Sequence, residues 1–155
     1  MRHRKRRGKL KVSMAHHRAM RRNLVASLFE HGSITTTVAK AKAFQPMAEK
    51  LITLARKGIR RKDEGTPEGV AAHLHAVRRA AQLLPYKPAV RRLFREVAPA
   101  VGDRPGGYTR ILRLSKSRLG DRAPLAMLML VDAPEREGAE VAEATGKATA
   151  AAGSK

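Results

Sequence analysis

An excess of positive charge is the feature that most limits how this chain can fold. Its 155 residues include 33 Lys and Arg against 13 Asp and Glu, which gives a formal net charge of +20. Such side chains are rarely buried without partners, and they repel one another in a free folded state. Arg supplies 21 of these cations, and a guanidinium can donate two parallel hydrogen bonds to a phosphate. The composition therefore predicts a folded body whose charge is matched by a polyanion.

The residue types that are missing exclude several classes of protein. The chain has no cysteine, so disulfides, thiolate zinc sites and Cys nucleophiles are excluded. Aromatic residues make up 3% and Trp is absent, which leaves too few rings for a platform that stacks splayed bases. No run approaches the roughly 20 apolar residues of a membrane span. Any binding of nucleic acid must therefore rely on charge and shape.

The two ends of the chain differ in composition from its middle. Residues 1–12 hold seven cations and no acid, and we expect an arm that becomes ordered on RNA phosphate. The alternative is a solvated tail with no binding role. Residues 132–155 are rich in Ala and carry five acids and three bases, which predicts a disordered acidic tail. The sequence thus predicts one globular domain over residues 13–131.

Apolar residues at helical spacing predict helices in the first two thirds of that domain. Ser13 is the expected N-cap of the first helix, and Gly32 the residue that ends it. Pro46 is expected to kink the second helix or to restart it, and Thr66 with Pro67 marks the start of the third. The expected helices cover residues 14–31, from a threonine of 35–37 to about 58, 67 to about 82, and a short stretch from 88.

Three strands are expected, over residues 33–38, 108–114 and 126–131. The last is a continuous apolar run, which is typical of a strand in the middle of a sheet or covered on both faces. A loop is expected over Pro99–Gly107, and a basic hairpin joins the last two strands. The element order α-β-α-α-α-β-β predicts an α+β fold, a two-layer α/β arrangement in which helices pack on a small sheet.

No catalytic or cofactor site is predicted. His73 and His75 are two residues apart and face different ways on a helix, so they do not match a helical zinc motif. Gly102, Gly106 and Gly107 are not followed by the Gly-Lys-Ser/Thr of a P-loop. The acids of residues 1–131 are scattered, whereas metal-dependent nucleases need clustered carboxylates. We therefore expect no enzyme, no metal and no cofactor.

Five ordered blocks of sequence, spread over residues 1–131, resemble the bacterial large-subunit ribosomal protein L-seventeen family. The blocks are Met1-Arg2-His3 with His17-Arg18-Ala19-Met20, Arg22-Asn23-Leu24, Ser27-Leu28 and His31; Thr36-Thr37 with Lys40-Ala41-Lys42; Glu49-Lys50-Leu51-Ile52-Thr53-Leu54-Ala55; Gly106-Gly107-Tyr108-Thr109-Arg110-Ile111-Leu112; and Gly120-Asp121-Arg122-Ala123-Pro124. The resemblance implies a structural, non-catalytic constituent of the large ribosomal subunit that binds rRNA near the polypeptide exit region. It also implies a cytoplasmic, ribosome-bound chain that contacts large-subunit rRNA and neighbouring ribosomal proteins, with no small-molecule substrate. Because the resemblance begins at Met1, no cleaved presequence is expected.

Three zones of cations are the candidate rRNA contacts: the arm, the first helix, and a surface formed by Lys40, Lys42 and the hairpin near residues 116–122. Recognition is expected to follow RNA shape and backbone, with little base readout. The candidate residues are Arg2, His3, Arg4, Lys5, Arg6, Arg7, Lys9, Lys11, His17, Arg18, Arg21, Arg22, Asn23, Lys40, Lys42, Arg110, Lys116, Arg118 and Arg122. Secondary candidates, some of which must simply face solvent, are Arg56, Lys57, Arg60, Arg61, Arg78, Arg79, Arg91 and Arg92.

Two alternative functions remain open from the sequence. One is a DNA-binding, nucleoid-type protein with a basic arm, which equal affinity for random duplex DNA and rRNA would favour. The other is a nuclease or RNA-modifying enzyme, which the scattered acids disfavour.

Overall fold

Helix α1 (Met14–His31) begins and ends where its flanking residues predict. In the computed structural model, which describes residues 10–132, the Ser13 hydroxyl accepts a hydrogen bond from the backbone N–H of His16 at 3.3 Å. Gly32 ends the helix with a φ of 75°, and its N–H donates to the Leu28 carbonyl at 2.8 Å. The fully buried residues of α1 all lie in its second half, while His17 and Met20 of its first half pack at the edge of the core.

Strand β1 (Ser33–Thr37) leads directly into helix α2 (Val38–Asp63). α2 continues through Pro46 to Asp63, so the predicted restart at Pro46 and the predicted end near residue 58 were both wrong. A proline removes one backbone donor from a helix. Here Phe44 and Met47 are buried on either side of it, and this packing keeps the helical path.

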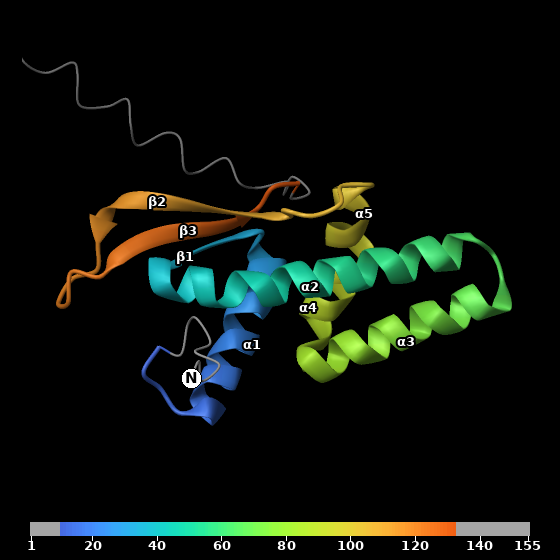
Figure 1. The fold of residues 1–155 in the computed structure, drawn as a ribbon, viewed down its shortest axis with the longest axis horizontal. Coiled ribbons are helices and arrows are strands. Elements are labelled where there is room, and N and C mark those ends of the chain that lie inside the picture. Colours follow the sequence, from blue (N-terminus) through green and yellow to red (C-terminus); the bar gives the residue numbers. More distant parts are fainter. Residues whose placement is uncertain (1–9, 133–155) are drawn as a thin grey trace, which may run out of the picture.

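Helix α3 (Pro67–Leu83) folds back along α2, and small residues let the two helices approach closely. The Thr66 hydroxyl caps α3 by accepting from the Gly69 N–H at 3.0 Å, as the sequence predicts. A Cβ placed on Gly58 would lie 2.7 Å from the Ala76 Cβ, and one on Gly69 would lie 2.0 Å from the Arg61 carbonyl oxygen. The pair forms a helical hairpin at the right-hand end of the molecule (Figure 1).

The next helical stretch consists of α4 (Lys87–Arg92), a π turn (Leu93–Val97) and α5 (Ala98–Val101). Helix therefore continues beyond the predicted start of the loop at Pro99. The Ala98 N–H donates to the Leu93 carbonyl, the spacing of a π turn. Pro99 falls in the first turn of α5, where its missing donor is tolerated.

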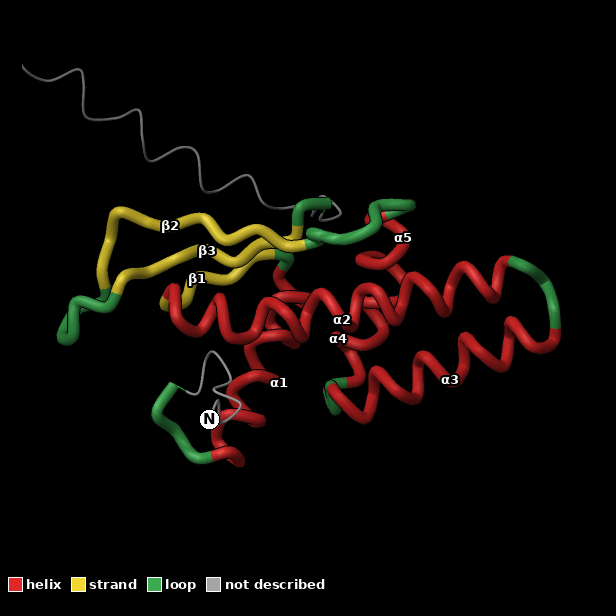
Figure 2. The backbone as a smooth tube through the Cα atoms, viewed as in Figure 1, coloured by secondary structure: helices red, strands yellow, loops and turns green. Residues whose placement is uncertain are grey.

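The sheet is antiparallel in the order β1-β3-β2, and β3 (Pro124–Leu130) is its central strand, as one of the two sequence alternatives predicted. Ala126, Leu128 and Leu130 are buried, while the alternate residues of β3 are partly exposed. The helices cover one face of the sheet (Figure 1, Figure 2). Large buried side chains between these layers include Phe29, Phe44, Leu51, Ile52 and Tyr108. The predicted two-layer α+β fold is confirmed.

Strand β2 (Thr109–Ser117) is longer than predicted and is irregular near its end. Its pairing with β3 shifts register between Arg113 and Ser117. The extra residues bend the strand before the turn, as bulges do, and the bend is visible at the left of Figure 1. The β2–β3 hairpin therefore points its turn away from the rest of the sheet.

The close approach of α3 to α2 makes Gly69 sensitive to substitution. Gly69→Ala is expected to lower the free energy of unfolding by about 2 kcal/mol, because the new Cβ meets backbone that cannot swing aside. Urea denaturation measures this change. Gly106→Ala is the control, since a Cβ there meets no atom within 4 Å, and a change within about 0.5 kcal/mol is expected. Equal stability of both variants would contradict the observed helix spacing.

Candidate nucleic-acid interface

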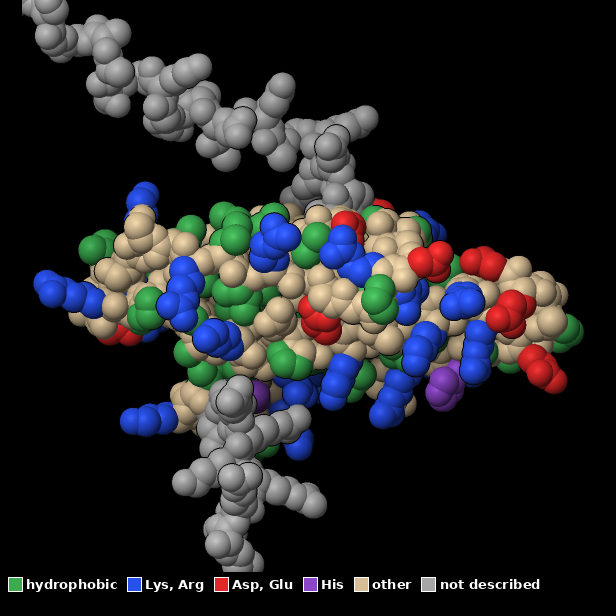
Figure 3. Space-filling model, turned by 45° about the horizontal axis from the view of Figure 1, so that its top comes forward, with side chains coloured by type: hydrophobic (Ala, Val, Ile, Leu, Met, Phe, Trp, Pro, Cys, Tyr) green, Lys and Arg blue, Asp and Glu red, His purple; other side chains and the backbone are tan. Residues whose placement is uncertain are grey.

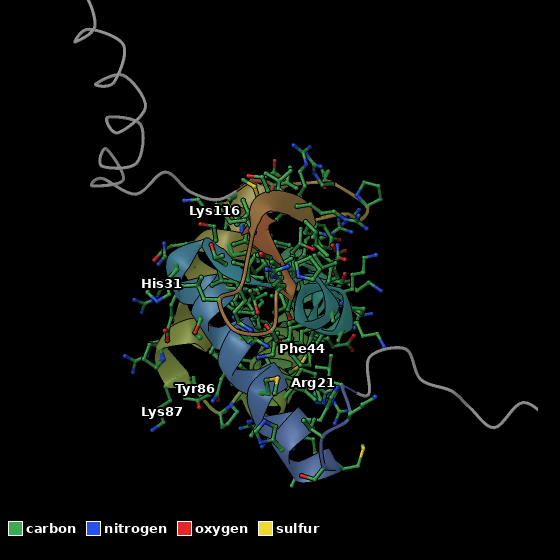
Figure 4. The ribbon with its side chains drawn as sticks, turned by 90° about the vertical axis from the view of Figure 1, so that its left-hand side faces the viewer. Arg21, His31, Phe44, Tyr86, Lys87 and Lys116 are labelled. Carbon is green, nitrogen blue, oxygen red and sulfur yellow. The ribbon has the colours of Figure 1, made fainter. Side chains whose placement is uncertain are left out.

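Three elements that carry predicted rRNA contacts lie at the same end of the molecule. The beginning of α1, the beginning of α2 and the β2–β3 hairpin all lie at the left of Figure 1. Figure 4 looks directly at this end and shows Arg21 of α1 below and Lys116 of β2 above. Side chains far apart in sequence are thereby placed on one end, which we call the cationic end: Lys11, Arg18, Arg21, Arg22, Lys40, Lys42, Lys116 and Arg122.

Most of the predicted arm lies outside the described residues, namely Arg2, His3, Arg4, Lys5, Arg6, Arg7 and Lys9. The described part begins at Leu10, which is partly buried and packs against the core. Leu10 and Lys11 have φ values of 53° and 50°, so the backbone turns here before α1. Lys11 is exposed directly after the Leu10 contact.

Several predicted contact residues have partners within the chain. The His17 ring packs edge-on against Phe44 with centroids 5.3 Å apart. The Tyr86 hydroxyl donates to the Asn23 side-chain oxygen at 2.6 Å. His17 and Asn23 therefore help to hold α1 in place, whereas Arg18 is exposed on the same helix.

The first turn of α2 has no acid and carries Lys40, with Lys42 just beyond it. Thr37 occupies the N-cap position, as the sequence allowed, but its side chain makes no capping hydrogen bond. Cations near a helix N-terminus oppose the helix dipole, and the free N–H groups there favour an anion. α1 also begins without an acid, whereas α3, at the other end of the molecule, begins with Glu68. The helix starts at the cationic end thus favour a bound anion.

The turn of the β2–β3 hairpin is closed by an ion pair. The Arg118 Nε donates to the Asp121 Oδ1 at 2.9 Å, and a second guanidinium nitrogen bonds to Oδ2. The side-chain hydrogen bonds from Arg118, with help from the Ala123 N–H, hold the pKa of Asp121 well below its ordinary value of 3.8. The same contact raises the pKa of Arg118. The Arg118 charge is therefore matched within the chain, while Lys116 and Arg122 stay exposed beside it.

Glu49 is a key residue that sequence reasoning missed as an interaction site. Its carboxylate accepts from the backbone N–H groups of Gly107 at 3.2 Å and Thr109 at 3.1 Å, and from the Thr109 hydroxyl at 2.7 Å. These bonds attach the start of β2 to α2. The sequence carries a signal for this role, since Glu49 is the only acid between Glu30 and Asp63.

Two of the secondary candidates also stabilise the fold. The Arg56 guanidinium donates to the Arg104 carbonyl and lies over the Tyr108 ring, 5.9 Å from its centroid. Arg92 donates to the Glu30 carbonyl and pairs with Glu96 at 2.8 Å. These two cations have internal roles, whereas Lys57, Arg60, Arg61, Arg78, Arg79 and Arg91 are exposed.

Most of the acids lie away from the cationic end, although Asp121 lies in the hairpin turn there. Figure 3 shows Lys and Arg along much of the visible face, with most Asp and Glu in its right-hand half. The acids of that half include Asp63, Glu64 and Glu68, which lie at and beside the turn between α2 and α3. Within residues 10–132, no three His, Asp or Glu side chains are grouped to hold a metal ion. No helix of this part of the chain could cross a membrane.

The fold and its surface define a basic α+β binding protein, and comparisons with known proteins assign its family. The family model described as ribosomal protein L17 matches residues 20–131. The large ribosomal subunit protein bL17 of Akkermansia muciniphila is 44% identical over 152 residues, covering 97% of this chain and 100% of the relative. The bL17 protein of Geobacter sulfurreducens is 45% identical over 132 residues, or 85% of this chain and 67% of the relative.

The chain belongs to the ribosomal protein L17 family. It is therefore a structural constituent of the large ribosomal subunit, a non-enzymatic part of a ribonucleoprotein that acts in translation. The resemblance seen in the sequence is confirmed, and so is the expectation that the chain is not an enzyme.

Removal of the Glu49 carboxylate should loosen the start of β2. Glu49→Ala is expected to cost about 1–3 kcal/mol of unfolding free energy, because the buried Thr109 amide loses its acceptor. Hydrogen exchange should show reduced protection of the Gly107 and Thr109 amides. Lys50→Ala, an exposed change one residue away, should leave both readouts close to wild type. Unchanged protection in Glu49→Ala would contradict this role.

The ion pair in the hairpin turn should depend on pH. Asp121 has a folded-state pKa below its unfolded value, so its contribution to the order of the turn is complete above about pH 4 and is lost as the pH falls through the lowered pKa. An NMR titration of the Asp121 carboxyl carbon measures that pKa. Asp121→Asn should weaken the turn at neutral pH as well. A titration midpoint near 3.8, the ordinary value, would contradict the ion pair.

Proposed function

We propose that the cationic end binds folded large-subunit rRNA through its phosphates. One observation carries this proposal: α1, α2 and the β2–β3 hairpin bring cations to one end (Figure 4), and Lys11, Arg18, Lys42, Lys116 and Arg122 are exposed there. At the opposite end, the exposed cations of the last turn of α2 lie beside a group of acids. Exposed cations of this kind bind phosphate by releasing condensed counterions. The start of α2, which has no side-chain cap and no acid in its first turn, adds the polarity that an anion prefers.

The mode of recognition is contact with the RNA backbone and shape. Among the described residues, Phe29, Phe44 and Tyr108 are buried, and Phe94 is partly buried against the core. Tyr86 is 41% exposed, but its hydroxyl is bonded to Asn23. No cluster of exposed rings is available on this part of the chain to stack bases.

The predicted arm extends the same proposal beyond the described residues. Its cations Arg2, Arg4, Lys5, Arg6, Arg7 and Lys9 precede Lys11 and α1 in the sequence. The family assignment supports rRNA and ribosomal proteins as partners, and it favours this function over a DNA-binding one. We further propose that the chain is cytoplasmic and ribosome-bound, with its binding site near the polypeptide exit region.

A salt titration of binding to a full-length transcript of bacterial large-subunit rRNA tests the proposal. Lys42→Ala should weaken binding and lower the slope of log K against log salt by about 0.7–0.9, the loss of one phosphate contact. Deletion of residues 1–11 should lower the slope further. Lys62→Ala, an exposed change at the opposite end, should leave the slope unchanged.

Two results would contradict the proposal. One is equal affinity of the wild-type chain for the rRNA transcript and for random duplex DNA. The other is an equal loss of binding in Lys42→Ala and Lys62→Ala, because it would remove the distinction between the two ends of the molecule.

A further inference from the structure

Leu119, at the turn of the β2–β3 hairpin, is 98% exposed. Among the large apolar side chains of residues 10–132 it has the highest exposed fraction, and Met14 follows at 61%. Burial of a Leu side chain is favourable by roughly 1.5–3 kcal/mol. Single exposed apolar residues are common on protein surfaces, so the stiffness and charge of its surroundings decide whether this one has a role.

The turn that carries Leu119 is held by several independent contacts. Beside the Arg118–Asp121 ion pair, the Arg118 N–H donates to the Ala123 carbonyl at 2.9 Å and the Arg122 N–H to the Arg118 carbonyl at 3.0 Å. Gly120 and Arg122 have φ values of 100° and 51°. The positive φ of Arg122 is strained for a non-glycine residue, so the surrounding contacts must maintain that conformation. The turn is thus well ordered, and it holds the Leu119 side chain in solvent.

The charge around Leu119 favours RNA as the partner. Arg118 is matched by Asp121, so the residue directly before Leu119 has little charge left for an external anion. Lys116 and Arg122 are exposed on the two sides of the turn, with no ion pair among the described residues. The arrangement is an apolar tip between two cations, which fits a recess lined by bases or riboses with phosphates at its rim.

We propose that Leu119 is an apolar anchor that enters such a recess in folded large-subunit rRNA and packs against a base or ribose, while Lys116 and Arg122 contact phosphates beside it. This inference rests on the proposed function and deepens it, since it adds a contact that charge alone does not supply. Because the turn is already ordered, little conformational entropy is lost when the tip is inserted. Leu119 then adds specificity for a particular RNA shape, whereas the cations add affinity for any phosphate.

Binding of three variants to the full-length rRNA transcript at fixed salt tests the anchor. Leu119→Ala should bind about tenfold more weakly, with an unchanged salt slope, because apolar contact releases no counterion. Leu119→Met should bind like wild type, since it keeps an apolar side chain of similar length. Leu74→Ala is the matched control, because Leu74 is 47% exposed on α3, away from the hairpin; it should also bind like wild type.

The outcomes separate this inference from the proposed function. If the wild-type chain prefers rRNA to random duplex DNA but Leu119→Ala binds as tightly as wild type, the anchor is overturned and the proposed function stands. If Leu119→Ala keeps its rRNA affinity but fails to join large subunits, the tip contacts a neighbouring protein and the anchor is again overturned. A wild-type chain with no preference for rRNA overturns both. Thermal unfolding of Leu119→Ala should match wild type, since its side chain contacts solvent.

Discussion

The bond between Glu49 and the start of β2 couples the two layers of this protein. Without it, Gly107 and Thr109 would have no carboxylate to hold the entry of the strand against α2. The Arg56 contacts with Arg104 and Tyr108 secure the same junction from the next turns of the helix. The Glu49 carboxylate thus stabilises the fold by accepting from backbone N–H groups rather than by pairing with a cation. It therefore does not neutralise any of the surface cations, which stay available for an external anion.

The cations of the described residues fall into two groups, those bonded within the chain and those exposed to solvent. Cations near the centre, such as Arg92, bond to carbonyls and to Glu96 within the chain. Cations at the end formed by α1, α2 and the hairpin are mostly exposed, as Arg18 and Lys42 are. Self-repulsion among the exposed group destabilises the free protein, and RNA bound as proposed would relieve it. The cations that hold the fold together are therefore different residues from those that we propose for RNA contact.

Local signals made much of the fold predictable, and distant contacts account for the rest. Ser13 and Gly32 bound α1 correctly because a helix cap depends on neighbouring residues. The outcome at Pro46 depends on burial of Phe44 and Met47 by other elements, which no local rule contains. Glu49 meets partners about 60 residues away. At the candidate interface, charge in the sequence indicated α1, α2 and the hairpin as candidates, but internal partners such as Asp121 for Arg118 follow only from the folded turn.

The position of β3 between its two neighbours leaves β1 and β2 as edge strands. Unpaired edges invite other chains to add a strand, which leads to aggregation. Here β1 has only five residues, and the pairing of β2 is irregular where it carries Lys116. Short length, a bend and repelling charge all discourage pairing between copies. The two edge strands therefore limit association between copies of the free chain.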